Sequence, residues 1–199
     1  MIVTVLKTGG DFRLEHVYKL AESVNGDFVC LTDCQQLQAE SFIETIPLTG
    51  NYPGWWSKME ALRPDLDLGD LLLLDLDTVA LPGVVFDEYA NEGELTVLND
   101  MLGGPHMNSG MMYITDDDKQ APWEKWEADC QNIMQSFPNG DQHFLAQFWD
   151  AASRWQDKYP GEIISYKGDY LKRGFEGGEK IVCFHGRPRP WDVEEEWLI

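Results

Sequence analysis

The chain has 199 residues, enough for one domain with a sizeable core, and we expect a single domain over residues 1–199. Its formal net charge of −20, from 35 acidic and 15 basic residues, argues against direct binding to nucleic acid or an anionic membrane surface, because those partners need clustered Lys and Arg. No apolar stretch approaches the ~20 residues that span a bilayer, no signal-like segment opens the chain, and the four cysteines lack paired zinc-site spacing, so we expect a cytoplasmic protein with free thiols.

The first third of the chain alternates between strand and helix patterns. Residues 2–6 form a β-rich run, 8–11 supply a turn, and apolar residues recur at helical spacing over 16–24. A second buried strand is predicted over 27–31, ending at Thr32-Asp33. This β-α-β start predicts a parallel sheet that binds its ligand at the carboxyl ends of its strands.

The middle of the chain predicts further strands of the same sheet. We expect a strand around 42–48, a short helix over 55–62 and a strand at Leu71–Leu74, which is apolar throughout and therefore suits a position covered on both faces. Strands are also predicted at 95–98 and 111–114. The segment 101–108 between them contains Gly103-Gly104-Pro105 and is predicted to be a loop.

The last third predicts two helices and two strands. Pro122 is expected near the first turn of one helix, and a second helix follows Pro138-Asn139-Gly140. Strands are predicted at 162–165 and 180–184. Eight tryptophans in a chain of this length indicate a wide core or an aromatic-lined cleft, and core is the default expectation.

Two carboxylates follow the apolar run of residues 71–74. Asp75 and Asp77, one residue apart at a strand end, can both approach one hard cation, directly or through water. The alternative is a loop whose aspartates only cap backbone groups, since a D-x-D pattern is common by chance. The same sequence pattern occurs in two enzyme classes, in which the two carboxylates have different roles.

In phosphatases of the haloacid dehalogenase type, the segment carries an aspartate nucleophile, and Asp75-Leu76-Asp77-Thr78-Val79 fits that spelling. Asp116-Asp117-Asp118 after the 111–114 strand could imitate the later acidic motif of that class. In GT-A glycosyltransferases, the D-x-D binds a metal that bridges the donor diphosphate. The phosphatase motif normally lies on the first strand, whereas here two β-α elements precede it.

Motifs further along the chain favour the transferase. Asn108-Ser109-Gly110 before an apolar strand resembles the N-[AS]-G segment of glycogenin-like and lipopolysaccharide galactosyltransferase-like enzymes. Gly140-Asp141-Gln142 resembles their D-Q motif. Residues 183–191 resemble their H-x-G-x-x-K-P-W segment, with Arg189 at the usual lysine position, and 55–60 resemble the GWW-x-K segment of small phage and bacterial transferases. These motifs occur in the family's order.

The resemblance implies a compact GT-A fold, with a mixed, mainly parallel sheet between helices. It also implies a metal site in which His185 joins Asp75 and Asp77 to hold Mn²⁺ or Mg²⁺. Asp141 and Gln142 are implied as the catalytic pair beside the anomeric carbon, although Asp141 could equally cap a helix. His185 has the alternative of a histidine packed at a strand end.

Donor contacts are implied for a further group of residues. The sugar pocket would be lined by Asn108, Ser109 and Gly110, although Gly110 could be a simple strand glycine. The remaining donor contacts are expected from Thr8, Gly9, Asp33, Lys58, Lys167, Gly186, Arg187 and Arg189. Asp33 could accept a hydrogen bond from uracil N3–H, and Lys58 has the alternative of a solvated side chain. The A-D-D-x-Y motif that this family has on its first strand is absent here, and residues 7–11 stand in its place.

We therefore predict metal-dependent transfer of a sugar from a nucleoside diphosphate donor, with UDP-sugar favoured and the anomeric configuration retained. The acceptor would be a glycan, a protein or a small molecule. The alternatives are a Mg²⁺-dependent phosphatase that uses Asp75 and Asp77, and a non-catalytic protein that binds nucleotide sugars. Eight of the 15 basic residues lie between Arg154 and Trp191, which suits a diphosphate but also an ordinary solvated face.

Overall fold

The computed structural model describes residues 1–39, 42–101, 103 and 106–198. Seven strands form the main sheet in the order β3-β2-β1-β4-β7-β6-β8, and three form a second sheet in the order β5-β10-β9. The main-sheet strands are β1 (Ile2–Leu6), β2 (Phe28–Thr32), β3 (Glu44–Pro47), β4 (Leu71–Leu74), β6 (Thr96–Asn99), β7 (Met107–Ile114) and β8 (Ser153–Arg154), and those of the second sheet are β5 (Thr78–Ala80), β9 (Ile163–Ser165) and β10 (Ile181–Cys183).

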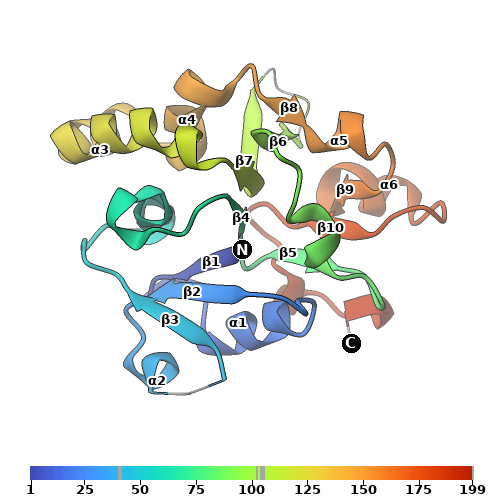
Figure 1. Cartoon of the computed structure of the whole chain (residues 1–199). Coiled ribbons are helices and arrows are strands. Elements are labelled where there is room, and N and C mark those ends of the chain that lie inside the picture. The colour runs from blue at the N-terminus through green and yellow to red at the C-terminus, as the bar shows by residue number, and fades with distance from the viewer. Residues whose placement is uncertain (40–41, 102, 104–105, 199) are drawn as a thin grey trace.

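Helices pack around these sheets (Figure 1). The α-helices are α1 (Leu14–Ala21), α2 (Gln35–Gln38), α3 (Asp116–Ser136), α4 (Asp141–Trp149), α5 (Trp155–Lys158) and α6 (Leu171–Arg173), and a 3₁₀ helix spans Gly54–Leu62. In Figure 1, α3 and α4 lie together at the upper left, whereas α1 and α2 lie below with β1–β3. Among the described residues no helix is long and apolar enough to cross a membrane.

Strand direction decides which residues meet at each edge of the main sheet. Strands β3, β2, β1 and β4 are mutually parallel, while β7 runs antiparallel to both β4 and β6. Leu74, at the end of β4, therefore pairs with Met111 near the start of the apolar half of β7. The carboxyl ends of β1 and β4 and the amino-terminal half of β7 share one edge. The prediction of a mixed, mainly parallel sheet is confirmed.

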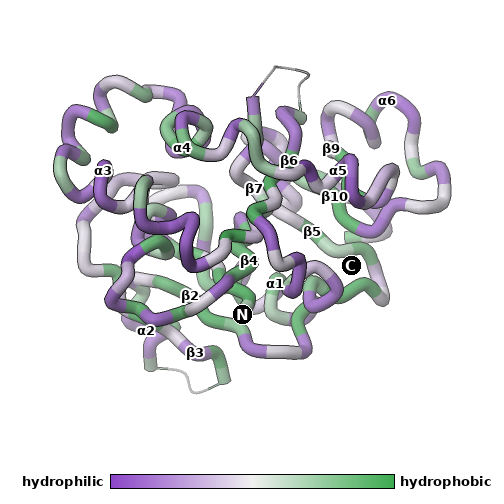
Figure 2. Tube along the Cα trace, turned by 45° about the horizontal axis from the view of Figure 1, so that its top comes forward, coloured by the Kyte–Doolittle hydropathy of each residue, from purple (hydrophilic) through white to green (hydrophobic). Residues whose placement is uncertain are grey.

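Strand β4 is buried on both faces, as its unbroken apolar run predicts. Leu72 and Leu74 pack in a cluster that contains Val17 of α1, whereas Leu71 and Leu73 pack in a cluster that contains Trp126 of α3. The tube coloured by hydropathy is green, meaning hydrophobic, at β4 (Figure 2). Most tryptophans belong to the core, namely Trp56, Trp123, Trp126, Trp149 and Trp155.

Two element boundaries differ most from those predicted. Strand β7 begins at Met107 instead of 111, because its polar first half still pairs with β6 across a register shift between Val97 and Leu98. Of the predicted loop 101–108, residues 102, 104 and 105 lie outside the described part. Helix α3 begins at Asp116 instead of near Pro122, because three aspartates in its first turn suit a helix amino terminus without adding apolar periodicity.

A buried carboxylate in the 3₁₀ helix Gly54–Leu62 fixes the loop that precedes this helix. Glu60 is fully buried and accepts hydrogen bonds from the backbone N–H groups of Thr49 and Gly50, at 2.7 and 2.9 Å. Its carboxylate also pairs with Arg63 at 3.0 Å. These contacts tie the loop after β3 to the 3₁₀ helix that supplies Lys58 to the site described below.

Replacing Glu60 by alanine is expected to lower the free energy of unfolding by about 3 kcal/mol, because it leaves buried donors and a guanidinium without a partner. Urea denaturation followed by circular dichroism measures this change. Glu127→Ala, which removes an exposed carboxylate from α3, should change stability by less than about 0.5 kcal/mol. Equal effects of the two substitutions would contradict the assigned role of Glu60.

Candidate active site

A cavity of about 490 Å³ opens where β1, β4 and the first half of β7 share a sheet edge. This volume lies in the range of cavities that bind small molecules and cofactors. Most predicted site residues line it, namely Lys58, Asp75, Asp77, Asn108, Ser109, Gly110, Asp141, Gln142, His185, Gly186 and Arg189. Segments as far apart as the 3₁₀ helix and the carboxyl-terminal region therefore meet in one site.

Backbone hydrogen bonds hold the aspartate turn after β4 between the two sheets. The Asp75 N–H donates to the Gly110 carbonyl at 2.9 Å, and the Thr78 N–H donates back to the Asp75 carbonyl at 3.0 Å. On the other side, the Phe184 N–H donates to the Asp77 carbonyl at 3.0 Å. The turn thus joins β7 to the segment after β10, and both aspartate side chains face the cavity.

Lys58 is the buried cation at the centre of the site. Its Nζ lies 3.0 Å from Asp75 Oδ1, 2.9 Å from Asp141 Oδ2 and 3.0 Å from Ser109 Oγ, with only 9% of its side chain exposed. Burial alone would lower the pKa of Lys58, but the carboxylates of Asp141 and Asp75 outweigh it, and the pKa is raised. Lys58 is therefore a charged counter-ion of two carboxylates and does not extend into solvent.

Asp77 is almost completely buried and pairs with the Arg189 guanidinium. Burial raises the pKa of Asp77 to about 7, and repulsion from the Asp75 carboxylate adds to the rise against the opposing effect of Arg189. Burial likewise raises the pKa of Asp75, against the opposing charge of Lys58. Two carboxylates thus share a site where additional positive charge stabilises their ionised forms.

Asn108 connects β7 to the start of α4. Its Nδ2 donates to Gln142 Oε1 at 3.1 Å, while its Oδ1 accepts from the Gly110 N–H at 2.9 Å. A Cβ at Gly110 would lie 3.0 Å from Asn108 Oδ1, which is tighter than ordinary van der Waals contact, so a larger residue would push this amide aside. The motifs N-[AS]-G and D-Q, 34 residues apart, therefore form one hydrogen-bonded unit.

His185 lies on the second sheet's side of the cavity. Its Nε2 is 2.6 Å from Ser165 Oγ, which also accepts a hydrogen bond from the Gly168 N–H. Burial, with a smaller contribution from Lys167, lowers the pKa of His185 to about 4. The imidazole is therefore neutral at neutral pH, which is the form that binds a metal ion.

The donor types suit a divalent ion, since two carboxylates and a neutral imidazole line the same cavity. Within the residues described, however, no three His, Cys, Asp or Glu side chains are gathered closely enough to hold one. Lys58 and Arg189 now neutralise Asp75 and Asp77. The set Asp75, Asp77 and His185 stays a prediction for the metal ligands.

Other predicted contacts lie around the cavity and not in its lining. Asp33 accepts from Lys7 Nζ at 2.6 Å and from the Thr8 N–H at 2.8 Å. Burial would raise the pKa of Asp33, but these hydrogen bonds lower it. Its carboxylate thus fixes Thr8 and the neighbouring Gly9 at the end of β1. An uracil N3–H would have to compete with Lys7 and Thr8 for this acceptor.

Arg187 and Lys167 also lie outside the lining. Arg187 is 64% exposed and pairs with Asp11 at 2.9 Å and with Asp192 at 3.1 Å. The Lys167 Nζ lies close to Gly186, since a Cβ at that glycine would be 3.6 Å from it. Of the predicted phosphate-binding cations near the carboxyl terminus, the cavity therefore contains Arg189.

Several residues that line the cavity were not among the predicted site residues, including Lys7, Asp11, Phe12, Trp55 and Asn139. Asp11 pairs with Arg187 across 176 positions of the chain, and the Arg189 guanidinium lies 4.8 Å from the centre of the Phe12 ring. The position of Lys7 directly after the first strand was the available signal for that end of the cavity. The pairing of Asp11 with Arg187 joins residues too far apart in the chain to be seen in a local sequence pattern.

The structure removes one of the two observations that supported the phosphatase alternative, the acidic segment after the 111–114 strand. Asp116-Asp117-Asp118 form the first turn of α3, after the carboxyl end of β7. Because β7 is antiparallel to β4 and Ile114 pairs with Leu71, these aspartates lie at the edge of the sheet opposite Asp75. They cannot complete an acidic motif around Asp75 and Asp77.

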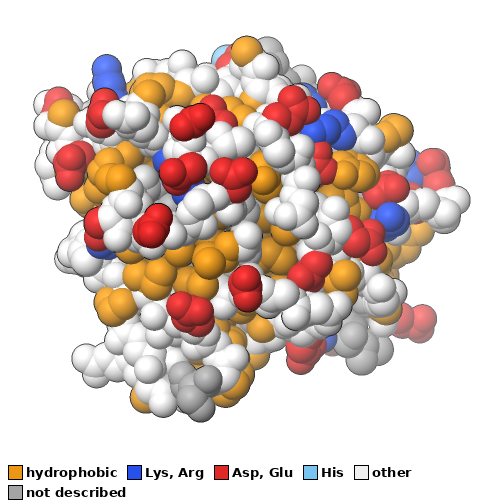
Figure 3. Space-filling model, viewed as in Figure 1, with side chains coloured by type: hydrophobic (Ala, Val, Ile, Leu, Met, Phe, Trp, Pro, Cys, Tyr) orange, Lys and Arg blue, Asp and Glu red, His pale blue; other side chains and the backbone are white. Residues whose placement is uncertain are grey.

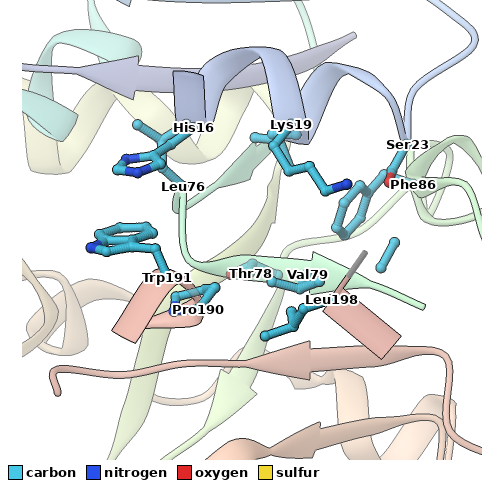
Figure 4. A pocket seen from close by; sticks show the side chains of 12 residues that line it. His16, Lys19, Ser23, Leu76, Thr78, Val79, Phe86, Pro190, Trp191 and Leu198 are labelled. Carbon is cyan, nitrogen blue, oxygen red and sulfur yellow. The ribbon is translucent and has the colours of Figure 1, made fainter. Parts of the chain in front are cut away.

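A second cavity, of about 200 Å³, lies behind the aspartate turn (Figure 4). Leu76 and Thr78 line both cavities. Its wall includes the stacked rings of His16 and Trp191, whose centroids are 3.6 Å apart. Figure 4 shows mostly apolar side chains around this space, and the polar groups that chemistry requires lie in the larger cavity.

The surface charge agrees with the composition. Acidic side chains are scattered over the face in Figure 3, and basic ones are few there. Free anionic partners would be repelled by this surface unless the cations of the cavity offset it. The cavity therefore provides a local exception for an anionic ligand, through Lys7, Lys58 and Arg189.

Comparison of the sequence with protein-family models and with curated proteins gave no match. Among solved structures, the glycosyltransferase GlyE from Streptococcus pneumoniae TIGR4 is similar with a TM-score of 0.66 and 17% identity, covering 98% of this chain and 56% of GlyE. The galactosyltransferase LgtC, in complex with donor and acceptor sugar analogs, is similar with a TM-score of 0.63 and 13% identity, covering 98% of this chain and 90% of LgtC. An active-site mutant of LgtC gives a TM-score of 0.61 at 12% identity.

These likenesses show the fold. The chain has the GT-A-like architecture of these glycosyltransferases, and the predicted resemblance is confirmed at that level. The chain spans about half the length of GlyE, with 56% of that protein covered.

Proposed function

We propose that the chain transfers a sugar from a nucleoside diphosphate donor to an acceptor at the 490 Å³ cavity. The observation that carries this proposal is the convergence of the aspartate turn, the Asn108–Gln142 pair and buried Lys58 at one sheet edge. Ligands of open α/β sheets bind at such an edge. The similar structure of LgtC, which is in complex with donor and acceptor sugar analogs, supports this choice of substrate class.

The cations of the cavity account for binding of the diphosphate. Arg189 can form charge-assisted hydrogen bonds with phosphate oxygens, which are shorter and stronger than those between neutral groups. Lys58 has a different role, because its Nζ is already surrounded by Asp75, Asp141 and Ser109. It holds those carboxylates ionised and in place while the donor binds above them.

A divalent ion, Mn²⁺ or Mg²⁺, would be held by Asp75, Asp77 and His185. It would supply Lewis-acid stabilisation of the negative charge that develops on the departing nucleoside diphosphate. The neutral state of His185 and the raised pKa values of the two aspartates support this assignment. The choice of uracil as the donor's base is supported by the resemblance alone, because Asp33 already accepts hydrogen bonds from Lys7 and Thr8.

Asp141 and Gln142 act on the sugar. Asn108 fixes the Gln142 amide at 3.1 Å, so this group can be held beside the anomeric carbon without searching among rotamers. One of the similar structures is an active-site mutant of LgtC in which a glutamine is changed to glutamate, which supports an active-site role for Gln142. We further propose that the transfer retains the anomeric configuration, as in the enzymes with the D-Q motif.

A donor panel tests the proposal. UDP, GDP and ADP, and the glucose and galactose conjugates of UDP, are each added with Mn²⁺, and the melting temperature is recorded. A ligand at 100 times its Kd stabilises the protein by about 2.7 kcal/mol, which raises the melting temperature by about 8 °C in a chain of this size. UDP and at least one UDP-sugar should produce this shift, and GDP and ADP should not.

The phosphatase rival makes a different prediction for the same preparation. It requires release of inorganic phosphate from p-nitrophenyl phosphate with Mg²⁺. The position of the three aspartates of α3 at the opposite edge leads us to expect no release above that of Asp75→Ala. Phosphate release that depends on Asp75, without a shift by any nucleotide, would reject the transferase.

A further inference from the structure

Two consecutive tryptophans in the 3₁₀ helix Gly54–Leu62 have opposite environments. Trp56 is 5% exposed and stacks on Trp126, with ring centroids 5.1 Å apart. Trp55 is 54% exposed, although burial of so large a side chain contributes strongly to stability in most proteins. Core packing thus explains Trp56 and leaves Trp55 without that role.

Trp55 lies on the open rim of the active-site cavity. It lines the cavity together with Gly54 and Asn139, which are both exposed. A Cβ at Gly140 would approach the indole Nε1 to 2.8 Å, so the ring lies directly against the residue that precedes Asp141. Gly140 has a φ of +105°, and both its conformation and the ring's proximity exclude a larger residue. The exposed aromatic face is therefore built against the start of the D-Q segment.

An exposed aromatic ring next to an amide side chain is suited to binding a carbohydrate. A pyranose ring has an apolar face of C–H groups, which packs on an aromatic ring, and hydroxyl groups around its edge, which need hydrogen-bond partners. Trp55 supplies the ring and Asn139 supplies an amide that can both donate and accept. The net charge of −20 disfavours an acidic sugar at an exposed rim.

We infer that Trp55 is the stacking platform of an acceptor subsite for a neutral pyranoside. This inference rests on the proposed transferase function. The donor sugar belongs beside the buried groups Lys58 and Ser109, whereas a ring on Trp55 stays open to solvent and can continue into a longer glycan. Asp141 and Gln142, which follow Gly140 directly, would then lie between the two sugars.

The test uses methyl β-D-glucopyranoside as the probe, because one face of its ring carries three axial C–H bonds. Saturation-transfer difference NMR, titrated in the presence of UDP and Mn²⁺, should show contact between this face and the wild-type protein. Trp55→Ala should weaken the glycoside Kd about tenfold, the cost of losing one stacking contact, while Trp55→Phe should keep it within about twofold. The affinity for UDP, measured by calorimetry, should not change in either variant.

Phe42→Ala is the matched control, since Phe42 is 70% exposed and lies outside the cavity lining. This substitution should leave the glycoside signal unchanged. A glycoside Kd that is the same in Trp55→Ala and wild type, or no contact with the wild type while UDP binds, would overturn the subsite and leave the proposed function standing. Failure of the wild type to bind UDP would instead reject the proposed function.

Discussion

Asp77→Ala is expected to abolish the part of UDP binding that depends on Mn²⁺, weakening the affinity in its presence by at least about a hundredfold, because loss of even an outer-shell partner of a metal ligand can cost that much. The reason is that Asp77 and Asp75 line the same cavity close to each other, and the Asp77 carboxylate is one of the proposed ligands. Without metal the effect should have the opposite sign. Removing Asp77 then deletes a negative charge and frees Arg189 for the diphosphate.

Calorimetry of UDP binding, with Mn²⁺ and with a chelator, separates these two effects. Asp117→Ala removes an exposed carboxylate at the opposite sheet edge and should leave both affinities unchanged. His185→Ala extends the test to the proposed third ligand and should also remove the Mn²⁺ dependence. If Asp77→Ala keeps the full Mn²⁺ dependence of the wild type, the metal assignment is wrong.

Lys58→Met is expected to destabilise the fold by about 3 kcal/mol and to reduce donor cleavage by at least about a hundredfold. Methionine is an unbranched side chain one atom shorter than lysine, and it leaves Asp75 and Asp141 buried without their shared cation. Their ionised forms then repel each other. Either the carboxylates take up protons or the turn after β4 opens, and both outcomes disturb the site that holds the diphosphate.

Urea denaturation and a donor-cleavage assay below the unfolding transition measure the two effects separately. Lys125→Met, on the exposed face of α3, should leave stability within about 0.5 kcal/mol of the wild type and cleavage unchanged. The account of Lys58 as a buried counter-ion fails if its variant matches Lys125→Met in stability. A loss of stability with full cleavage would restrict Lys58 to a structural role.

Local patterns predicted those parts of the fold that depend on local composition. The apolar run Leu71–Leu74 coincides with β4, because a strand covered on both faces needs no polar alternation. Boundaries with a polar beginning, as in β7 and α3, were misplaced. The polar residues that begin these two elements do not show the periodic spacing of apolar residues from which strands and helices were predicted.

Motifs predicted which residues gather in the cavity better than what each one contacts. The motifs predicted Asn108 for the sugar pocket and Gln142 for the catalytic pair, but not the hydrogen bond that joins the two side chains. The sequence alone left open whether Lys58 is solvated, but its side chain is buried. Its partners Asp75 and Asp141 lie 17 and 83 positions away in the chain, so no local pattern reveals them. Arg187 shares a motif with Arg189 but points to Asp11, since only the folded chain decides which arginine enters the cavity.

Cleavage of the donor tests the central claim most directly. The wild-type protein is incubated with Mn²⁺ and the UDP-sugar that shifts its melting temperature most, and proton NMR follows the anomeric signals over time. We predict release of UDP together with a sugar whose first detectable anomer has the configuration of the donor, and loss of both signals in Asp77→Ala. Binding of the donor without any release of UDP, with or without an added sugar acceptor, would contradict the account and identify a nucleotide-sugar-binding protein instead.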